Sequence, residues 1–154
     1  MKLYLVQHAK AESKDVNPER PLTEEGRRDI SEVAAFIKTL SLSVDYLWHS
    51  GKTRARQTAE ILAEVITVRD ETAAHDGLAP NDDVKTIKEQ IISANNDIMI
   101  VGHMPFVAKL ASLLLTGSES PGIVTFRQGG IVCLSCENDS QWQIDWMIIP
   151  DLLF

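Results

Sequence analysis

Two histidines follow directly after two apolar runs that lie far apart in the chain. His8 follows the run Leu3–Val6 and Gln7, and His103 follows the run Asp97–Val101 and Gly102. Short apolar runs of this kind are typical of strands buried in a parallel sheet. Because ligands bind at the carboxyl ends of such strands, both imidazoles are expected at one edge of the sheet. One imidazole can act there as a nucleophile, and the other can stabilise developing charge.

A third segment, His49–Thr58, also follows an apolar run and carries Arg54 and Arg56. It is expected to begin as a loop and to continue as a helix, so that its first turn faces the same sheet edge. A helix N-terminus favours anions, and a guanidinium group matches two phosphate oxygens. Imidazoles and arginines at one edge therefore point to phosphate chemistry. Taken alone, this helix does not tell which arginine is in the site and which is solvated.

The elements that position these residues alternate between strand and helix. Apolar runs predict strands at Leu3–Val6, Val44–Trp48, Asp97–Val101, Ile131–Ser135 and Trp142–Ile149. Helical spacing begins at Thr23 as N-cap and continues to Leu40, and it recurs over Thr53–Val65, Val84–Ile92 and Pro105–Leu115. This alternation predicts an α/β fold with a largely parallel sheet covered by helices, and the last two strands form a C-terminal hairpin across 137–140.

Three finer expectations concern helix starts and loops. Asn81 or Asp82 is expected to cap the third helix, and Pro105 is expected in the first turn of the fourth. The segments Ala9–Pro21 and Glu71–Asp83 have no clear period and are expected to be irregular, as is a Gly/Ser/Pro-rich loop over 116–122. Polar loops near strand ends are where function concentrates.

Composition limits the class of protein. The 154 residues are expected to form a single domain over 1–154, with 44% hydrophobic and 24% charged residues. A formal net charge of −7 argues against non-specific nucleic-acid binding, although it allows a local positive pocket. No apolar run approaches the roughly 20 residues of a membrane span, and the N-terminus lacks the pattern of a signal peptide. We therefore expect no membrane partner and a cytoplasmic location.

Cys133 and Cys136 are spaced as C-x-x-C, but their context reads as a strand. Residues three apart in a strand face opposite sides of a sheet. A redox pair needs a helix N-terminus, and a zinc site needs further ligands. The pair is interpreted as two thiols of a strand, with no metal site.

The motifs around these residues resemble those of the histidine phosphatase superfamily, the phosphoglycerate mutase-like proteins. Together with the chain length, they resemble most the small SixA-type phosphohistidine phosphatases. The matching residues are His8, Ser50-x-x-x-Arg54-Ala55-x-Gln57-Thr58, Val101-Gly102-His103-Met104-Pro105 and Arg20-Pro21-Leu22-Thr23-x-x-Gly26.

The resemblance implies a role for each matching position. His8 is the expected nucleophile that becomes phosphorylated, and His103 is the second catalytic imidazole. Arg54, rather than Arg56, is a catalytic phosphate clamp, and Arg20 lines the phosphate pocket. The implied fold is a Rossmann-like three-layer sandwich with a mostly parallel central sheet, and neither a metal nor an organic cofactor is implied.

The chain departs from the family signature Arg-His-Gly, because it reads Gln7-His8-Ala9. Gln7 can donate a hydrogen bond to phosphate but brings no charge, and losing a charge-assisted contact costs about 1.5–3 kcal/mol. Arg20 or Lys10 is a candidate to supply the missing charge. Ala9 matters only where that backbone needs a positive φ.

A second departure concerns the general acid that larger members use for an alkoxide leaving group. The acids available in the second irregular segment are interpreted as loop and cap residues: Glu71, Asp76, Asp82 and Asp83. A phosphohistidine substrate needs less help, so the expected substrate is a phosphorylated histidine of a signalling protein. The alternatives are a phosphomonoesterase acting on a small phosphate ester, and a phosphate- or phosphoprotein-binding module weakened by Gln7.

Overall fold

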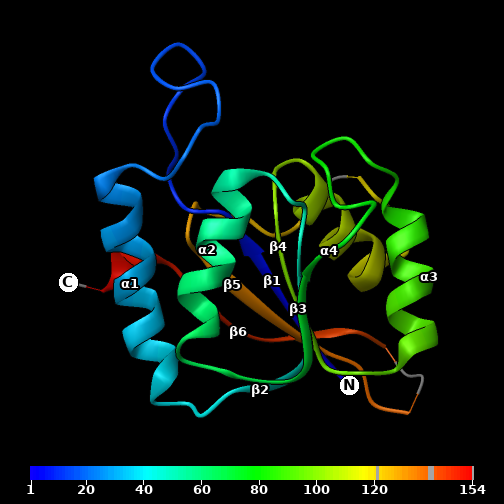
Figure 1. The fold of residues 1–154 in the computed structure, drawn as a ribbon. Coiled ribbons are helices and arrows are strands. Elements are labelled where there is room, and N and C mark those ends of the chain that lie inside the picture. Colours follow the sequence, from blue (N-terminus) through cyan, green and yellow to red (C-terminus); the bar gives the residue numbers. More distant parts are fainter. Residues whose placement is uncertain (121, 139–140, 154) are drawn as a thin grey trace.

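A six-stranded sheet forms the centre of the computed structural model, which describes residues 1–120, 122–138 and 141–153 (Figure 1). The strand order is β3-β2-β4-β1-β5-β6. Four strands run parallel, β1 (Lys2–Gln7), β2 (Ser43–His49), β3 (Thr67–Ala74) and β4 (Ile98–Gly102). The antiparallel strands β5 (Ile131–Ser135) and β6 (Gln143–Ile148) complete the sheet as the predicted C-terminal hairpin.

Helices cover both faces of the sheet. α1 (Glu24–Lys38) and α2 (Thr53–Ala63) pack on one face with a core that includes Val6 and Val101. α3 (Val84–Ala94) and α4 (Phe106–Thr116) pack on the other face, and a short 3-10 helix (Pro150–Leu152) follows β6 beside α1. The predicted three-layer α/β sandwich is confirmed.

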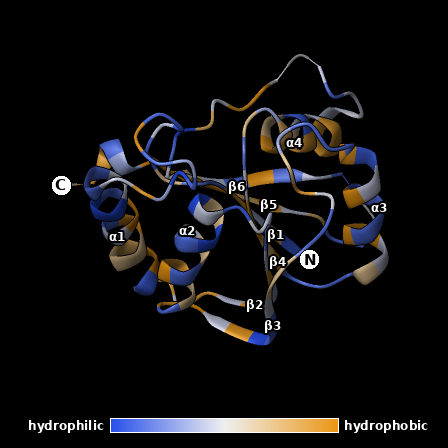
Figure 2. Ribbon diagram, turned by 45° about the horizontal axis from the view of Figure 1, so that its top comes forward, coloured by the Kyte–Doolittle hydropathy of each residue, from blue (hydrophilic) through white to orange (hydrophobic). Residues whose placement is uncertain are grey.

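The central position of β4 explains its sequence. All five of its residues are buried, because β1 and β2 flank it and helices cover both of its faces. The helices turn their apolar sides toward the sheet (Figure 2). Cys133 and Cys136 are both buried but belong to the cores on opposite faces, as their strand spacing predicted.

A glycine lets the loop after β1 pack closely against α1. The Thr23 hydroxyl caps this helix by accepting a hydrogen bond from the Gly26 amide at 2.9 Å. A Cβ atom added at Gly26 would lie 2.1 Å from the Lys10 carbonyl oxygen, too close for any side chain. Gly26 therefore fixes the path of the loop that leaves the nucleophile candidate, His8.

The structure corrects the prediction that Glu71–Asp83 is wholly irregular. Its first part belongs to β3, a polar edge strand whose mostly exposed residues have no core-facing period. Asp83, not Asn81 or Asp82, caps α3 by accepting the Lys85 amide at 2.9 Å.

The remaining differences lie at the ends of elements. Pro105 is the N-cap of α4 rather than a residue of its first turn. α1 and α2 end two residues before the predicted Leu40 and Val65. Residues 139–140 of the hairpin turn predicted over 137–140 lie outside the described part of the chain. The same holds for residue 121 of the Gly/Ser/Pro-rich loop predicted over 116–122.

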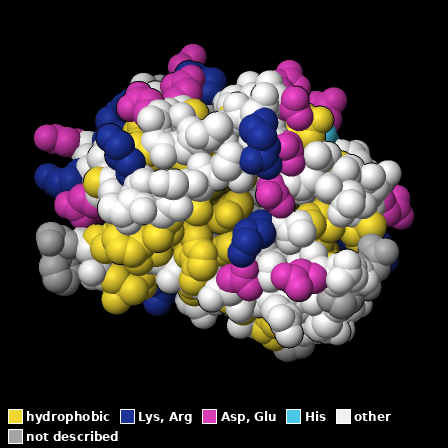
Figure 3. Space-filling view, turned by 90° about the horizontal axis from the view of Figure 1, so that it is seen from below, with side chains coloured by type: hydrophobic (Ala, Val, Ile, Leu, Met, Phe, Trp, Pro, Cys, Tyr) yellow, Lys and Arg dark blue, Asp and Glu magenta, His cyan; other side chains and the backbone are white. Residues whose placement is uncertain are grey.

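The two ends of the sheet differ in surface character. Viewed from the end where the parallel strands begin, hydrophobic side chains gather in a patch between scattered charged groups (Figure 3). The candidate histidines follow the opposite, carboxyl ends of β1 and β4. In the part of the chain that the structure describes, no helix is long and apolar enough to cross a membrane.

Candidate active site

The parallel pairing of β1 with β4 brings the two histidines together. Gln7 lies opposite Gly102 at the ends of these strands, and the His8 amide donates to the Gly102 carbonyl at 3.0 Å. The next residues are His8 and His103, whose ring centroids lie 5.0 Å apart with the planes tilted by 54°. The prediction that the two imidazoles lie close together at one edge of the sheet is confirmed.

His8 is arranged as a neutral imidazole with one free lone pair. Its ring is 6% exposed, and Nδ1 lies 2.7 Å from the Ala9 carbonyl oxygen. A carbonyl can only accept, so Nδ1 carries the proton and Nε2 keeps its lone pair. Burial lowers the pKa of His8 to about 4, with smaller contributions from the Arg54 and Arg20 charges. At neutral pH the Nε2 atom is therefore available for nucleophilic attack.

His103 is more deeply buried, at 1% exposure. Burial, with smaller contributions from His8 and Arg54, lowers its pKa to about 3. Nε2 lies 2.6 Å from the Ser50 hydroxyl, whereas Nδ1 is buried without a hydrogen-bond partner among the described residues. The second imidazole is thus neutral at pH 7 and held through one nitrogen.

Arg54 and Arg56 have different environments. The Arg54 Nε atom is buried and has no hydrogen-bond partner in the described part of the chain. Burial lowers the Arg54 pKa, and the nearby Arg20 adds to this effect. Arg56 instead forms an exposed ion pair with Glu60 at 2.8 Å. A buried guanidinium nitrogen without such a partner is suited to contact an anion, so Arg54 is the candidate site residue of the two.

Arg20 reaches the same region from the loop after β1. Its backbone has a φ of 50°, in the left-handed region that is uncommon for residues other than glycine. The Arg20 amide donates to the Asn17 carbonyl at 2.9 Å, and its Nε atom donates to the Glu12 carbonyl at 3.0 Å. The side-chain bond limits where the guanidinium can lie. The backbone bond helps to hold the strained backbone, which persists only where its surroundings enforce it.

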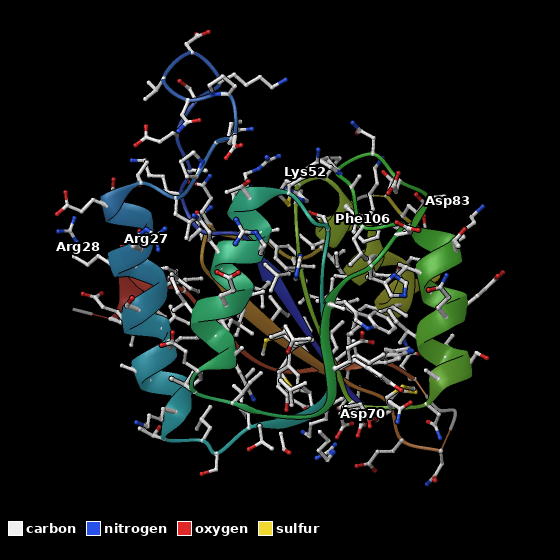
Figure 4. The ribbon with its side chains drawn as sticks, viewed as in Figure 1. Arg27, Arg28, Lys52, Asp70, Asp83 and Phe106 are labelled. Carbon is white, nitrogen blue, oxygen red and sulfur yellow. The ribbon has the colours of Figure 1, made fainter. Side chains whose placement is uncertain are left out.

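A pocket of about 460 Å³ lies between this loop and the start of α2. Arg20 and Arg54 line it together with seven further residues, which are Lys14, Pro18, Glu19, Gly51, Lys52, Thr53 and Pro80. Lys52 lies directly before α2, at the edge of the sheet where α4 also starts with Phe106 (Figure 4). Four cationic side chains against one carboxylate make this pocket positive in a chain of net charge −7.

Gln7 and Lys10 differ in what they offer the site. The Gln7 side chain is half-buried and makes no hydrogen bond within the described ranges, while its carbonyl accepts the Gly129 amide at 2.9 Å. Lys10 is paired with Glu25 at 2.6 Å on the surface. Of the two candidates for the missing charge, Lys10 is therefore engaged elsewhere, and Arg20 is the one beside Arg54.

Two of the four acids of the second irregular segment, Asp82 and Asp83, are loop and cap residues as interpreted, whereas Glu71 belongs to a strand. Asp82 accepts from the Ala79 amide at 2.9 Å, and Asp83 caps α3. Glu71 lies exposed in β3. The charged groups that shift the pKa of His8 are both arginines, and those that shift the pKa of His103 are also basic residues.

Three motif residues have contacts that sequence reasoning did not assign. Thr58 accepts the Ala9 amide at 3.0 Å, and Gln57 accepts the Leu22 amide at 2.8 Å, so α2 holds both ends of the loop after β1. Ser50 contacts His103. All three lie in the segment that stood out for its arginines and match the motif of the resembling family, but neither signal indicates their contacts.

Comparisons with known proteins agree with this geometry. A sequence profile of the histidine phosphatase superfamily (branch 1) matches residues 3–79. The protein histidine phosphatase SixA complexed with tungstate superposes with a TM-score of 0.86 at 20% identity, covering 99% of both chains. An alpha-ribazole phosphatase from Shigella flexneri gives 0.78 at 13% identity, over 97% of both chains.

A phosphoserine phosphatase from Entamoeba histolytica, in complex with 3-phosphoglyceric acid, gives a TM-score of 0.69 at 18% identity, over 95% of both chains. No curated protein sequence matches the chain significantly. The structural likenesses show a shared fold, and the profile covers half of the sequence. The chain belongs to the histidine phosphatase superfamily.

Proposed function

We propose that this protein is a phosphohistidine phosphatase that works through a phosphorylated His8. The single observation that carries the proposal is the pairing of a neutral His8, with its Nε2 lone pair free, with a buried Arg54 Nε that lacks a partner among the described residues. The first group is a nucleophile and the second is a vacant anion contact. Superfamily members are phosphatases or mutases. The similar SixA structure holds tungstate, an oxyanion.

In the first step, the His8 Nε2 lone pair forms a bond to phosphorus while the bond between phosphorus and the substrate imidazole breaks. The departing nitrogen takes up a proton from solvent and leaves as neutral imidazole. In the second step, water attacks phosphorus, the bond to His8 breaks, and its electron pair returns to Nε2. Water's proton is lost to solvent as phosphate departs, which regenerates the free enzyme.

The charge on the phosphoryl oxygens is stabilised by groups that are fixed before the substrate arrives. Arg54 and Arg20 are proposed to bind the oxygens as guanidinium forks, and Gln7 and His103 to donate further hydrogen bonds. Phosphoryl transfer depends mainly on such positioning and charge stabilisation. The proposed steps use side chains and water, and the proposal includes neither a metal nor an organic cofactor.

The leaving group follows from the charges around the histidines. The charged groups that shift the pKa values of His8 and His103 are basic, so none of them is suited to protonate an alkoxide, and the carboxylate of Glu19 lines the pocket of Arg20 and Arg54 without shifting either histidine. An imidazole leaves readily once protonated and needs no dedicated acid. The surroundings of the histidines therefore favour a phosphoramidate over a phosphate ester.

The proposed partner is a phosphorylated signalling protein. The loop after β1 projects from the body of the molecule, above the carboxyl ends of the strands (Figure 1). Its residues Lys14, Pro18 and Glu19 form one wall of the pocket that holds Arg20 and Arg54. A phosphohistidine on a protein surface would place its neighbouring residues against this wall.

A second candidate function is hydrolysis of a small phosphate ester, since the alpha-ribazole and phosphoserine phosphatases share the fold. A third is phosphate or phosphoprotein binding without turnover, favoured by the uncharged Gln7.

The test is to incubate the wild type and His8→Ala with a phosphohistidine peptide, an aryl phosphate and a sugar phosphate. We expect release of phosphate from the peptide by the wild type alone. Equal turnover of sugar phosphate and peptide would favour the small-ester enzyme. Peptide binding without release would favour the binding module.

A further inference from the structure

We propose that Ser50 is a positioning residue that holds the His103 imidazole in place and fixes its proton on Nε2. The Ser50 hydroxyl lies 2.6 Å from His103 Nε2. The positioning role falls to a residue that the proposed chemistry does not use. It rests on the proposed function only where activity is measured.

The fold places this contact by strand register. His49 lies opposite Val101 where β2 pairs in parallel with β4. Ser50 follows directly after β2, and His103 follows Gly102 at the end of β4. The two side chains therefore meet across neighbouring strands, and the sheet itself fixes the separation of their backbones.

Counting donors and acceptors decides which atom carries the proton. A neutral imidazole has one N–H donor and one acceptor nitrogen. With the proton on Nδ1, that donor would be buried without a partner among the described residues. With the proton on Nε2, the N–H donates to Ser50, and the half-buried serine can turn its own hydroxyl hydrogen toward the pocket. Because buried donors left unpaired are rare, the second arrangement is favoured.

The Lys52 amide completes the arrangement. It donates to the Ser50 hydroxyl at 3.3 Å, in the turn that leads into α2. Ser50 is thus tied on one side to the start of the helix that carries Arg54, and on the other to His103. The Nε2–H that donates to Ser50 in the free protein is the one that His103 can offer to a phosphoryl oxygen once substrate binds, so Ser50 keeps the ring in its donating form until then.

The test compares Ser50→Ala with Ser50→Thr, which keeps the hydroxyl. Ser43→Ala is the matched control, because Ser43 begins the same strand β2 at its far end and contacts Arg69. Nitrogen-15 NMR of the free protein reports which imidazole nitrogen is protonated, and His103→Gln identifies the signals. We expect His103 in the Nε2–H form in the wild type, Ser50→Thr and Ser43→Ala, and a mixture of both forms in Ser50→Ala.

Kinetics supplies the second readout. With a phosphohistidine peptide, Ser50→Ala should lower kcat about tenfold with little change in KM, as expected for the loss of one hydrogen bond. Ser50→Thr should retain most activity. An unchanged protonation pattern in Ser50→Ala, or an Nδ1–H form in the wild type, would overturn the inference. The NMR measurement does not depend on turnover. An inactive wild type would therefore count against the phosphatase function, and the spectra would still show whether Ser50 fixes the His103 proton on Nε2.

Discussion

The hydroxyl of Thr58 accepts a hydrogen bond from the amide of Ala9, the residue directly after His8, at 3.0 Å. The same hydroxyl donates to the Arg54 carbonyl at 2.8 Å. One fully buried side chain in α2 thereby joins the backbone of the proposed nucleophile to that of the proposed phosphate clamp. Residues that hold such groups in register are part of what makes a site preorganised.

Replacing Thr58 with Val keeps the shape of the side chain and removes both hydrogen bonds. The Ala9 amide would then be buried without a partner, which costs about 1–3 kcal/mol. We expect the free energy of unfolding to fall by this amount in urea denaturation. Thr58→Ser retains the hydroxyl and should stay close to the wild type. Equal stability of Thr58→Val and the wild type would show that the link is not needed.

The contrast between Arg54 and Arg56 offers a matched pair of substitutions on one helix. Arg54→Gln should lower kcat/KM for a phosphohistidine peptide roughly 10- to 100-fold, because a charge-assisted contact is worth about 1.5–3 kcal/mol. Arg56→Gln removes only the exposed pair with Glu60 and should leave kcat/KM unchanged. Similar losses in both variants would point to a general effect of helix charge rather than a clamp.

Gln7 is the position where a charge can be added to the proposed site. Gln7→Arg would place a cation on the residue before His8, and the expected result is a rise of roughly 10-fold or more in turnover. Gln7→Glu provides the opposite charge and should abolish turnover. If Gln7→Arg leaves turnover as it was, Arg20 and Arg54 already supply all the charge that the reaction uses.

The buried histidines make stability depend on pH. Burial lowers the pKa of His8 to about 4 and of His103 to about 3, below the ordinary histidine value of about 6.5. Between these values the unfolded chain binds more protons than the folded protein, so stability falls as the pH drops through this range. Above about pH 6.5 both states carry neutral imidazoles, and this contribution no longer changes.

Urea denaturation at pH 5 and pH 7.5 measures this effect. The wild type should lose stability at pH 5, and His8→Gln combined with His103→Gln should lose less, because neither replacement titrates. An equal loss in both proteins would assign the pH dependence to other groups.

The spacing of apolar residues along the sequence predicted most of the helices and strands. The buried β4 and the amphipathic α1 have clear apolar periods, and the strand-end positions of His8 and His103 follow from parallel pairing. β3 was not predicted, because the residues of an exposed edge strand do not alternate between apolar and polar as they do in a strand with one face in the core. The prediction for the cap of α3 named Asn81 or Asp82, and only the backbone geometry selects their neighbour Asp83.

The finer parts of the site depend on contacts between distant segments. The bonds of Ser50 to His103 and of Thr58 to Ala9 exist only once the sheet has formed and α2 has packed against it. Sequence alone likewise cannot tell that Lys10 pairs with Glu25 whereas Arg20 turns toward Arg54. Such choices are set by tertiary geometry, and the residue types permit either outcome.

In the proposed mechanism, His8 carries the phosphoryl group between the two steps. The most direct measurement mixes the protein with a phosphohistidine peptide, stops the reaction within the first turnover, and locates the phosphoryl group by mass spectrometry under conditions that preserve phosphohistidine. We predict an acid-labile phosphoryl group on His8 that is absent from His8→Asn and present in Arg56→Gln. Phosphate release by the wild type without label on His8, or equal release by His8→Asn, would contradict the account.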